Sequence, residues 1–391
     1  MPHEVDGQVH WHEPVGLSAA GISRFLRPAL AYDRFMADEG VPVVRAASLD
    51  LRKVVRGSWR RLAGAGAYLQ MFGTEGGLGC ALIEIAASGA TRSEKHLFEE
   101  LVLVLEGRGT TELWLEDTDR RVVFEWQPGS LFSVPPNAVH RMVNATGSAA
   151  LLLSGTNAPA LVNMLGDVDA VFANPFVFRD RFDDELGLAF DDVEPDPVRG
   201  LALCRTHLVP DAIGCDLPLD NRYSPGYRQL ALSMTGAGMV CAVGEHRPGR
   251  YAKAHILSAS SVMVGLRGQG FSYLWPERSG PMPWADGAGD TVLRVEHSPG
   301  AIMGAGPGGG RWYHQIFNTG SVPLRHLVWS VPERAGGAPG KEIRDDTAVN
   351  LADGGTVISY AREDPYVRAG YLAELAQSGQ VNRMRDDDYA E

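Results

Sequence analysis

Short hydrophobic runs recur along the chain, separated by glycine and polar residues. The clearest runs are rich in Leu, Val and Ile and occupy residues 68–72, 81–86, 101–105, 229–233, 239–243 and 262–266. Apolar runs of this length that are bounded by turn residues are typical of buried β-strands. The pattern therefore predicts an all-β protein.

Helical patterns occur only near the two ends of the chain. The Asp364-Pro365 pair places a capping residue before a proline at the first helical position, and an apolar face follows it. We expect a helix over residues 365–377 and a second one around residues 29–37.

The two groups of strands belong to an internal repeat. In one ungapped register, identical residues of the first copy (Cys80, Ala81, Glu84, Leu105, Gly107, Gly109, Leu113, Trp114) match those of the second (Cys241, Ala242, Glu245, Leu266, Gly268, Gly270, Leu274, Trp275). Further along, His140 and Asn144 match His314 and Asn318. Self-similarity of this kind indicates one structural unit that has been duplicated.

The repeat predicts the organisation of the whole chain. We expect an N-terminal extension (1–60), a first barrel (61–165), a connector (166–225), a second barrel (226–335) and a C-terminal extension with a helix (336–391). The connector is rich in Asp, Asn, Pro and Arg, a composition typical of loops.

Charge and cysteine content narrow the classes of partner. The formal net charge of −12 disfavours binding to phosphate backbones or anionic lipid, so we expect neither nucleic acid nor membrane partners. No secretory signal is recognisable at the start of the sequence, and the four cysteines contain no Cys-x-x-Cys pair. These features predict free thiols and a cytoplasmic protein.

Chemistry-bearing residues are concentrated in the first copy. Glu94, His96 and Glu100 precede Gly107, and His140 follows the turn residues after position 129. This string resembles the two motifs of the cupin superfamily, and its duplication resembles a bicupin of the gentisate 1,2-dioxygenase-like group. The resemblance implies two tandem cupin barrels (double-stranded β-helix, jelly-roll) with short helices at the termini.

The residues themselves indicate a metal site in the first barrel. Positions 94, 96 and 100 share strand parity and would point inward together, with His140 arriving from a distant strand. An imidazole–carboxylate cluster suits Fe(II), Mn(II), Ni(II) or Zn(II), and the resemblance favours Fe(II). Glu94 stands where the family has a histidine, so it is either a fourth ligand or lies outside the ligand set. The alternative is a structural polar cluster without metal.

The second copy retains less of this pattern. His255, Leu257 and Ser261 stand where the first copy has Glu94, His96 and Glu100, and His314 matches His140. Two histidines without a third side chain rarely hold a metal tightly. We therefore expect His255 and His314 to be a vestigial site.

Three functions remain open at this point. The first is a non-haem Fe(II) dioxygenase in which His96, Glu100 and His140 bind the metal, and an aromatic, hydroxy or keto acid reacts with O2. The second is a non-redox metal-dependent lyase, decarboxylase or isomerase, similar to bicupins of the oxalate decarboxylase kind. The third is a metal-free ligand-binding bicupin. The apolar strands and the C-terminal helix favour a homo-oligomer.

Overall fold

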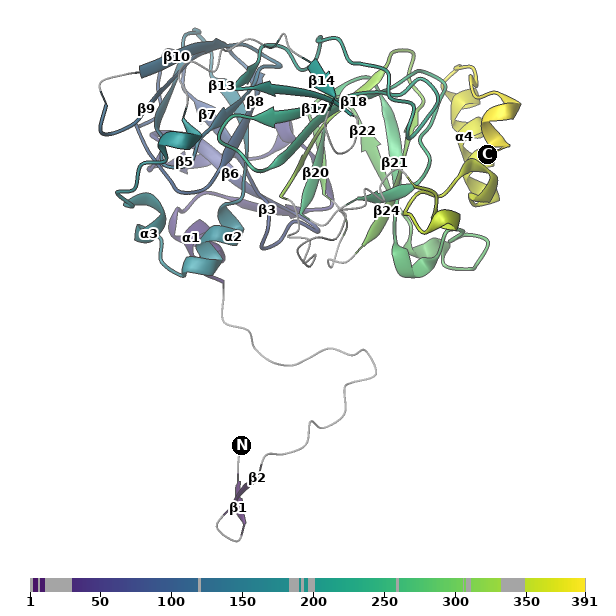
Figure 1. Ribbon diagram of the computed structural model, residues 1–391, viewed down its shortest axis with the longest axis horizontal. Helices are drawn as coiled ribbons and strands as arrows, with labels where there is room; N and C mark the ends of the chain where they lie inside the picture. Colours follow the sequence, from purple (N-terminus) through teal and green to yellow (C-terminus); the bar gives the residue numbers. More distant parts are fainter. Residues whose placement is uncertain are drawn as a thin grey trace. The chain divides into compact units, whose positions relative to one another are not determined.

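The computed structural model divides the chain into two compact units. Its described residues are 3–5, 8–10, 30–118, 121–182, 190, 193–195, 201–257, 260–304, 306, 311–331 and 349–390. Within the first unit, Met1–Leu30, strands β1 (His3–Val5) and β2 (Gln8–His10) pair antiparallel. The second unit, Ala31–Glu391, contains both barrels (Figure 1).

Two sheets that face each other form the first barrel. The larger sheet has the order β16 (Leu208–Val209), β11 (Leu131–Val134), β8 (Glu100–Glu106), β13 (Ala150–Thr156), β7 (Gly79–Ile85), β6 (Gly64–Met71) and β3 (Val43–Ala46), with β5 (Gly57–Trp59) beside β6. The smaller sheet has the order β10 (Arg121–Trp126), β9 (Gly109–Trp114) and β12 (Val139–Asn144). Val102 and Phe132 from the larger sheet pack with Leu113 and Phe124 from the smaller one, so the barrel has an apolar interior.

The second barrel repeats this plan. Its larger sheet has the order β14 (Val193–Pro195), β15 (Ala202–Thr206), β17 (Arg228–Met234), β18 (Val240–His246), β25 (Leu324–Ser330), β20 (Ser261–Arg267), β23 (Ala301–Gly304) and β4 (Ser48–Asp50). Its smaller sheet has the order β19 (His255–Leu257), β24 (Trp312–Asn318), β21 (Gly270–Pro276) and β22 (Leu293–His297). The predicted all-β class and the two tandem barrels are confirmed.

Segments outside the two predicted barrels also supply strands. From the predicted N-terminal extension, β3 and β5 join the first barrel, whereas β4 pairs with β23 of the second. From the predicted connector, β16 pairs with β11, and β15 runs parallel to β17. Short segments before and between the repeats therefore add strands to both large sheets. A pattern of local hydrophobic runs does not reveal these added strands. The segment boundaries themselves stay a prediction.

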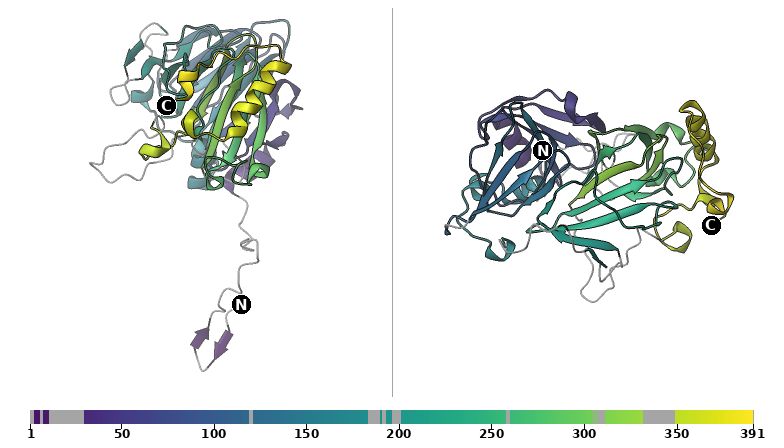
Figure 2. Two further views of the ribbon diagram at one scale, coloured as in Figure 1. Left: turned by 90° about the vertical axis from the view of Figure 1, so that its right-hand side faces the viewer. Right: turned by 90° about the horizontal axis from the view of Figure 1, so that it is seen from above.

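The two large sheets share an apolar cluster between the barrels. The two barrels lie side by side in the ribbon views (Figure 2). The cluster combines Leu82 and Leu101 of the first barrel with Val243 and Trp329 of the second. Gly155 on β13 lies against the Trp329 ring, where a β-carbon would overlap ring atoms. The missing side chain at this position therefore permits the close approach of the two sheets.

Four α-helices lie in the described part of the second unit. They are α1 (Ala31–Asp38), α2 (Ala158–Leu165), α3 (Asp169–Phe172) and α4 (Pro365–Gln377). The predicted terminal helices correspond to α1 and α4, and the Asp364 carboxylate accepts a hydrogen bond from the Tyr366 amide as the expected cap. The helices α2 and α3, which follow the first barrel, were not predicted. No described helix is both long and apolar enough to span a bilayer.

A substitution at the contact between the barrels tests the role of this cluster. We expect Gly155→Ala to lower the free energy of unfolding by about 1–3 kcal/mol, because the added methyl group overpacks the site against Trp329. Gly147→Ala is the matched control, because a β-carbon there meets open space. Urea denaturation of both variants measures the difference. Equal stabilities would contradict tight packing at Gly155.

Candidate metal centre

The segment between β7 and β8 carries two of the predicted ligands. Glu94 and His96 lie on this extended segment, and only Glu100 lies on β8. The expectation that all three share one strand is therefore wrong, because the chain bends between His96 and Glu100. The three side chains still converge, since the segment is fixed by contacts with other elements.

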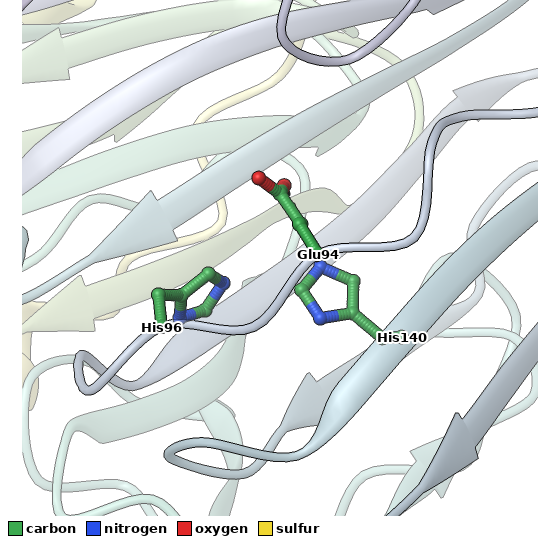
Figure 3. A group of neighbouring side chains, drawn as sticks. All are labelled: Glu94, His96 and His140. Carbon is green, nitrogen blue, oxygen red and sulfur yellow. Dashed lines mark ion pairs between the residues drawn. The ribbon is translucent and has the colours of Figure 1, made fainter. Parts of the chain in front are cut away.

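Backbone pairing places Glu94 beside His140. The Glu94 amide donates to the His140 carbonyl (N···O 3.1 Å), and the His140 amide donates to the Glu94 carbonyl (2.9 Å). His96 stacks on the Phe98 ring with 3.6 Å between ring centroids. Figure 3 shows Glu94 and His96 on one segment, and His140 opposite them on β12. A non-local strand pairing therefore assembles the site.

Potential ligand atoms of four residues approach one another. The Nε2 atoms of His96 and His140 lie 3.3 and 3.8 Å from Oε2 of Glu100, and His140 Nε2 lies 3.7 Å from Oε1 of Glu94. Glu94, His96 and His140 each offer one ligand atom within 4.8 Å of the others. This group of three contains Glu94 and not Glu100, although Oε2 of Glu100 lies near both imidazoles. The structure thus brings all four predicted residues together.

The two imidazoles are held from their outer side. Nδ1 of His96 lies 2.9 Å from the Phe98 carbonyl oxygen, and Nδ1 of His140 lies 3.4 Å from the Ala138 carbonyl oxygen. A carbonyl oxygen only accepts, so each Nδ1 carries the proton in these hydrogen bonds. Both Nε2 atoms therefore face the carboxylates, and each offers a lone pair to a metal when its imidazole is neutral. This is the usual arrangement of histidines that bind metals.

The two carboxylates are anchored in the same way. Arg61 donates to Oε2 of Glu94, and the Ser154 hydroxyl donates to Oε1 of Glu100. The other oxygen of each carboxylate lies near the imidazoles. Each glutamate therefore has one oxygen fixed by a donor and one oxygen available as a single-atom ligand.

The charges of the cluster shift its pKa values. Burial alone raises the pKa of Glu94, but the Arg61 guanidinium and the His140 imidazole lower it to about 2. Burial also opposes ionisation of Glu100, yet the two histidines and Ser154 lower its pKa. The pKa of His140 is raised, because the effect of the two glutamates exceeds that of burial. Both carboxylates are therefore ionised at neutral pH and can bind a cation.

Negative charge exceeds positive charge around the cluster. Arg61 contacts Glu94 and also lies 2.8 Å from Glu39, while Glu100 is buried nearby. These three carboxylates outnumber the guanidinium in a region with little water, where unpaired charge is costly. A divalent cation between the imidazoles and carboxylates offsets the excess. The donor set therefore fits a first-row divalent metal.

A small cavity of about 40 Å³ is lined by three of the four residues, Glu94, His96 and Glu100. Its aromatic wall includes Tyr32 and Phe35 from α1, Trp59 from β5 and Tyr68 from β6. Tyr68 is 4% exposed, and its hydroxyl has no hydrogen-bond partner among the described residues. The cavity therefore combines apolar walls with an unpaired hydroxyl group close to the candidate metal centre.

The second barrel contains imidazoles without the carboxylates. His255 and His314 pair across β19 and β24, as Glu94 and His140 do, with ring centroids 4.0 Å apart. Within the described ranges, no carboxylate forms an ion pair with either histidine. Burial lowers the pKa of His255 to about 4 and that of His314 well below its usual value. The predicted vestigial pair is thus a cluster of neutral imidazoles, and the loss of metal binding stays a prediction.

Sequence reasoning missed several residues around both sites. No local motif indicates Arg61, Tyr68 or the contact of Ser154 with Glu100. Each of these residues reaches the first site from a separate strand or turn. In the second barrel, His246, His297 and His326 join the two predicted histidines as buried residues. Strand parity could have indicated His246 and His326, but no spacing connected them with His255.

Comparisons with known proteins give only distant structural similarity. Oxalate decarboxylase from Bacillus subtilis at pH 4.6 is 12% identical and has a TM-score of 0.45, over 74% of this chain and 76% of that chain. A two-residue deletion mutant of the same enzyme is 13% identical with a TM-score of 0.45, over 80% and 85%. Neither an activity nor a site is transferred at these values. No protein-family model and no curated protein sequence matches the chain.

The buried histidines of the second barrel predict acid sensitivity. Lowered pKa values are found for His246, His255, His297, His314 and His326. Between about pH 6.5 and 4 the unfolded chain therefore binds more protons than the folded one, so stability falls as the pH decreases. His140 and Glu363, whose pKa values are raised, act in the opposite direction but are fewer.

Urea unfolding at pH values from 7.5 to 4.5 measures this loss. We expect His326→Gln to flatten the slope, because the pKa of His326 is lowered to about 3 and one proton difference disappears. Above pH 4.5, Glu94 and Glu100 contribute little to the slope, because their lowered pKa values act at lower pH. A stability that stays constant over this range would contradict the prediction.

Substitutions of paired histidines test the asymmetry between the barrels. We expect His140→Ala to lose the metal, because its Nε2 lies near both glutamates. The matched variant His314→Ala should keep about one divalent ion per chain, because no carboxylate pairs with His314 among the described residues. Elemental analysis after reconstitution with Fe(II) or Mn(II) measures both. Equal loss from the two variants would assign a metal to the second barrel as well.

Proposed function

We propose that the first barrel binds one Fe(II) ion through His96, Glu100 and His140, and that the protein is a dioxygenase. The observation that carries the proposal is the convergence of two imidazole Nε2 atoms on Oε2 of Glu100, at 3.3 and 3.8 Å. Two histidines and one carboxylate with open positions are the ligand set of non-haem Fe(II) oxygenases. The proposed partners are a small-molecule acid and O2.

His96, Glu100 and His140 would hold the iron, which would supply redox chemistry towards O2 when bound. The chain's own residues hold the ligands and shape the cavity. Ser154 fixes Glu100, and backbone carbonyls orient both histidines. Tyr32 and Phe35 cover the cavity with aromatic rings, which excludes bulk water from the reacting groups.

Glu94 distinguishes this site from the gentisate dioxygenase group that the motifs resemble. We propose that Glu94 is a fourth ligand of the metal. How strongly it binds the metal would depend on Arg61, because the guanidinium already holds one oxygen of the Glu94 carboxylate. A carboxylate in place of an imidazole adds negative charge to the ligand set. The resemblance to that group supports a dioxygenase.

One observation favours a second function. Two carboxylates beside two imidazoles form a harder ligand set than imidazoles alone, and hard oxygen ligands suit Mn(II). The second candidate is therefore a non-redox Mn(II)-dependent decarboxylase, lyase or isomerase. In that reaction the same residues would bind the acid without consuming O2.

Oxygen uptake separates these functions. We expect Fe(II)-reconstituted protein to consume O2 with at least one hydroxy, keto or dihydroxy-aromatic acid in an oxygen-electrode assay. His96→Ala should abolish the uptake, and His255→Ala, the matched variant in the second barrel, should keep most of it. Metal binding with product formation but without O2 uptake would instead support the non-redox function. No metal binding by wild-type protein would contradict both and leave a metal-free ligand-binding protein.

A further inference from the structure

Tyr68 lines the cavity, and its buried hydroxyl group has no acceptor among the described residues. We infer that it binds the carboxylate of a small, non-aromatic 2-hydroxy or 2-oxo acid, an inference that rests on the proposed function. Tyr68 would then be a substrate-binding residue in addition to the four metal-binding candidates. Three features of the molecule support this binding: the unpaired donor of Tyr68, the charge around it and the size of the cavity.

Polar groups beside Tyr68 are already engaged. The Trp59 indole donates to Glu39, and Arg61 pairs with both Glu39 and Glu94. The Tyr68 hydroxyl, in contrast, is buried and donates to no acceptor among the described residues, because the neighbouring Arg61 guanidinium can only donate. An unsatisfied buried donor costs about 1–3 kcal/mol, so a ligand that accepts its hydrogen bond gains that free energy.

The charge around Tyr68 favours an anionic ligand. Arg61 is held next to the cavity, and its guanidinium lies 5.3 Å from the Trp59 ring that forms part of the wall. A divalent ion held by Glu94 and Glu100 would compensate both carboxylates, so Arg61 would be opposed by Glu39 alone. A carboxylate oxygen is the acceptor that such a donor and such a charge recognise best.

The size of the cavity excludes an aromatic ring. Its volume is about 40 Å³, whereas a cavity that binds benzene measures about 150 Å³. Tyr32 and Phe35 from α1 close it, and their rings contact Tyr68 edge-on with centroids 6.2 Å away. Only a molecule with a few heavy atoms fits beside the metal ligands in this conformation.

An oxygen on the carbon next to the carboxylate completes the match. A 2-hydroxy or 2-oxo acid offers three oxygens within a very small volume. One carboxylate oxygen can accept from Tyr68, which leaves the other oxygens for the metal that Glu94, His96, Glu100 and His140 would hold. A simple acid such as acetate lacks the additional oxygen and should bind more weakly.

Calorimetric titration of Zn(II)-loaded protein tests the inference without turnover. We expect glycolate and pyruvate to bind more tightly than acetate, and salicylate not to bind. Tyr68→Phe keeps the ring packing and removes only the hydroxyl, so it should weaken glycolate and pyruvate binding by about tenfold or more while the zinc content is unchanged. Tyr389→Phe is the control, because Tyr389 also has an unpaired buried hydroxyl but lies in the C-terminal segment.

Three outcomes would overturn the inference. They are unchanged affinity in Tyr68→Phe, equal loss in Tyr389→Phe, and salicylate binding to wild-type protein as tightly as pyruvate. Phe35→Ala provides a second check, since removal of this ring should admit salicylate.

Titration of metal-free protein with Zn(II) separates this inference from the proposed function. Failure to bind zinc contradicts the proposed function, whereas zinc binding without binding of either small acid contradicts only the substrate class.

Discussion

The pairing of one extended segment with β12 determines the geometry of the first barrel's site. Two reciprocal hydrogen bonds join the backbones of Glu94 and His140 and fix their side chains on the same side. His96 follows Glu94 on this segment, and Glu100 begins the next strand. Because the main chain makes this pairing, the same geometry persists in the second barrel, where His255 and His314 replace the two residues.

The anchoring contacts then give each residue a defined donor atom. Carbonyl oxygens fix the protonated nitrogen of each imidazole, while Arg61 and Ser154 fix one oxygen of each carboxylate. Without these contacts, burial would favour the protonated form of both carboxylates. The cluster therefore has ionised carboxylates and correctly oriented nitrogens before any metal binds. Such preorganisation reduces the free energy lost when the ligand set is assembled.

Local spacing in the sequence predicted the strands, the terminal helices and the four residues of the cluster. These features depend on the two-residue period of strands and on short motifs, both of which are visible along the chain. Arg61 and Tyr68 could not be predicted in the same way, because sheet pairing between distant segments places them at the site. The expectation that Glu94, His96 and Glu100 share one strand was wrong for a related reason: the chain before β8 is an extended loop and not a continuation of that strand.

The two barrels show how one substitution changes the electrostatics of an otherwise shared frame. At equivalent positions, Glu94 brings a negative charge that Arg61 and His140 stabilise, whereas His255 is buried as a neutral ring and its pKa falls to about 4. A barrel lined by neutral imidazoles can remain folded without a cation. A barrel with several carboxylates around one guanidinium needs one to balance its charge. Both copies thus keep the same backbone pairing, and the side chains at three matching positions (Glu94, His96 and Glu100 against His255, Leu257 and Ser261) account for the difference in chemistry.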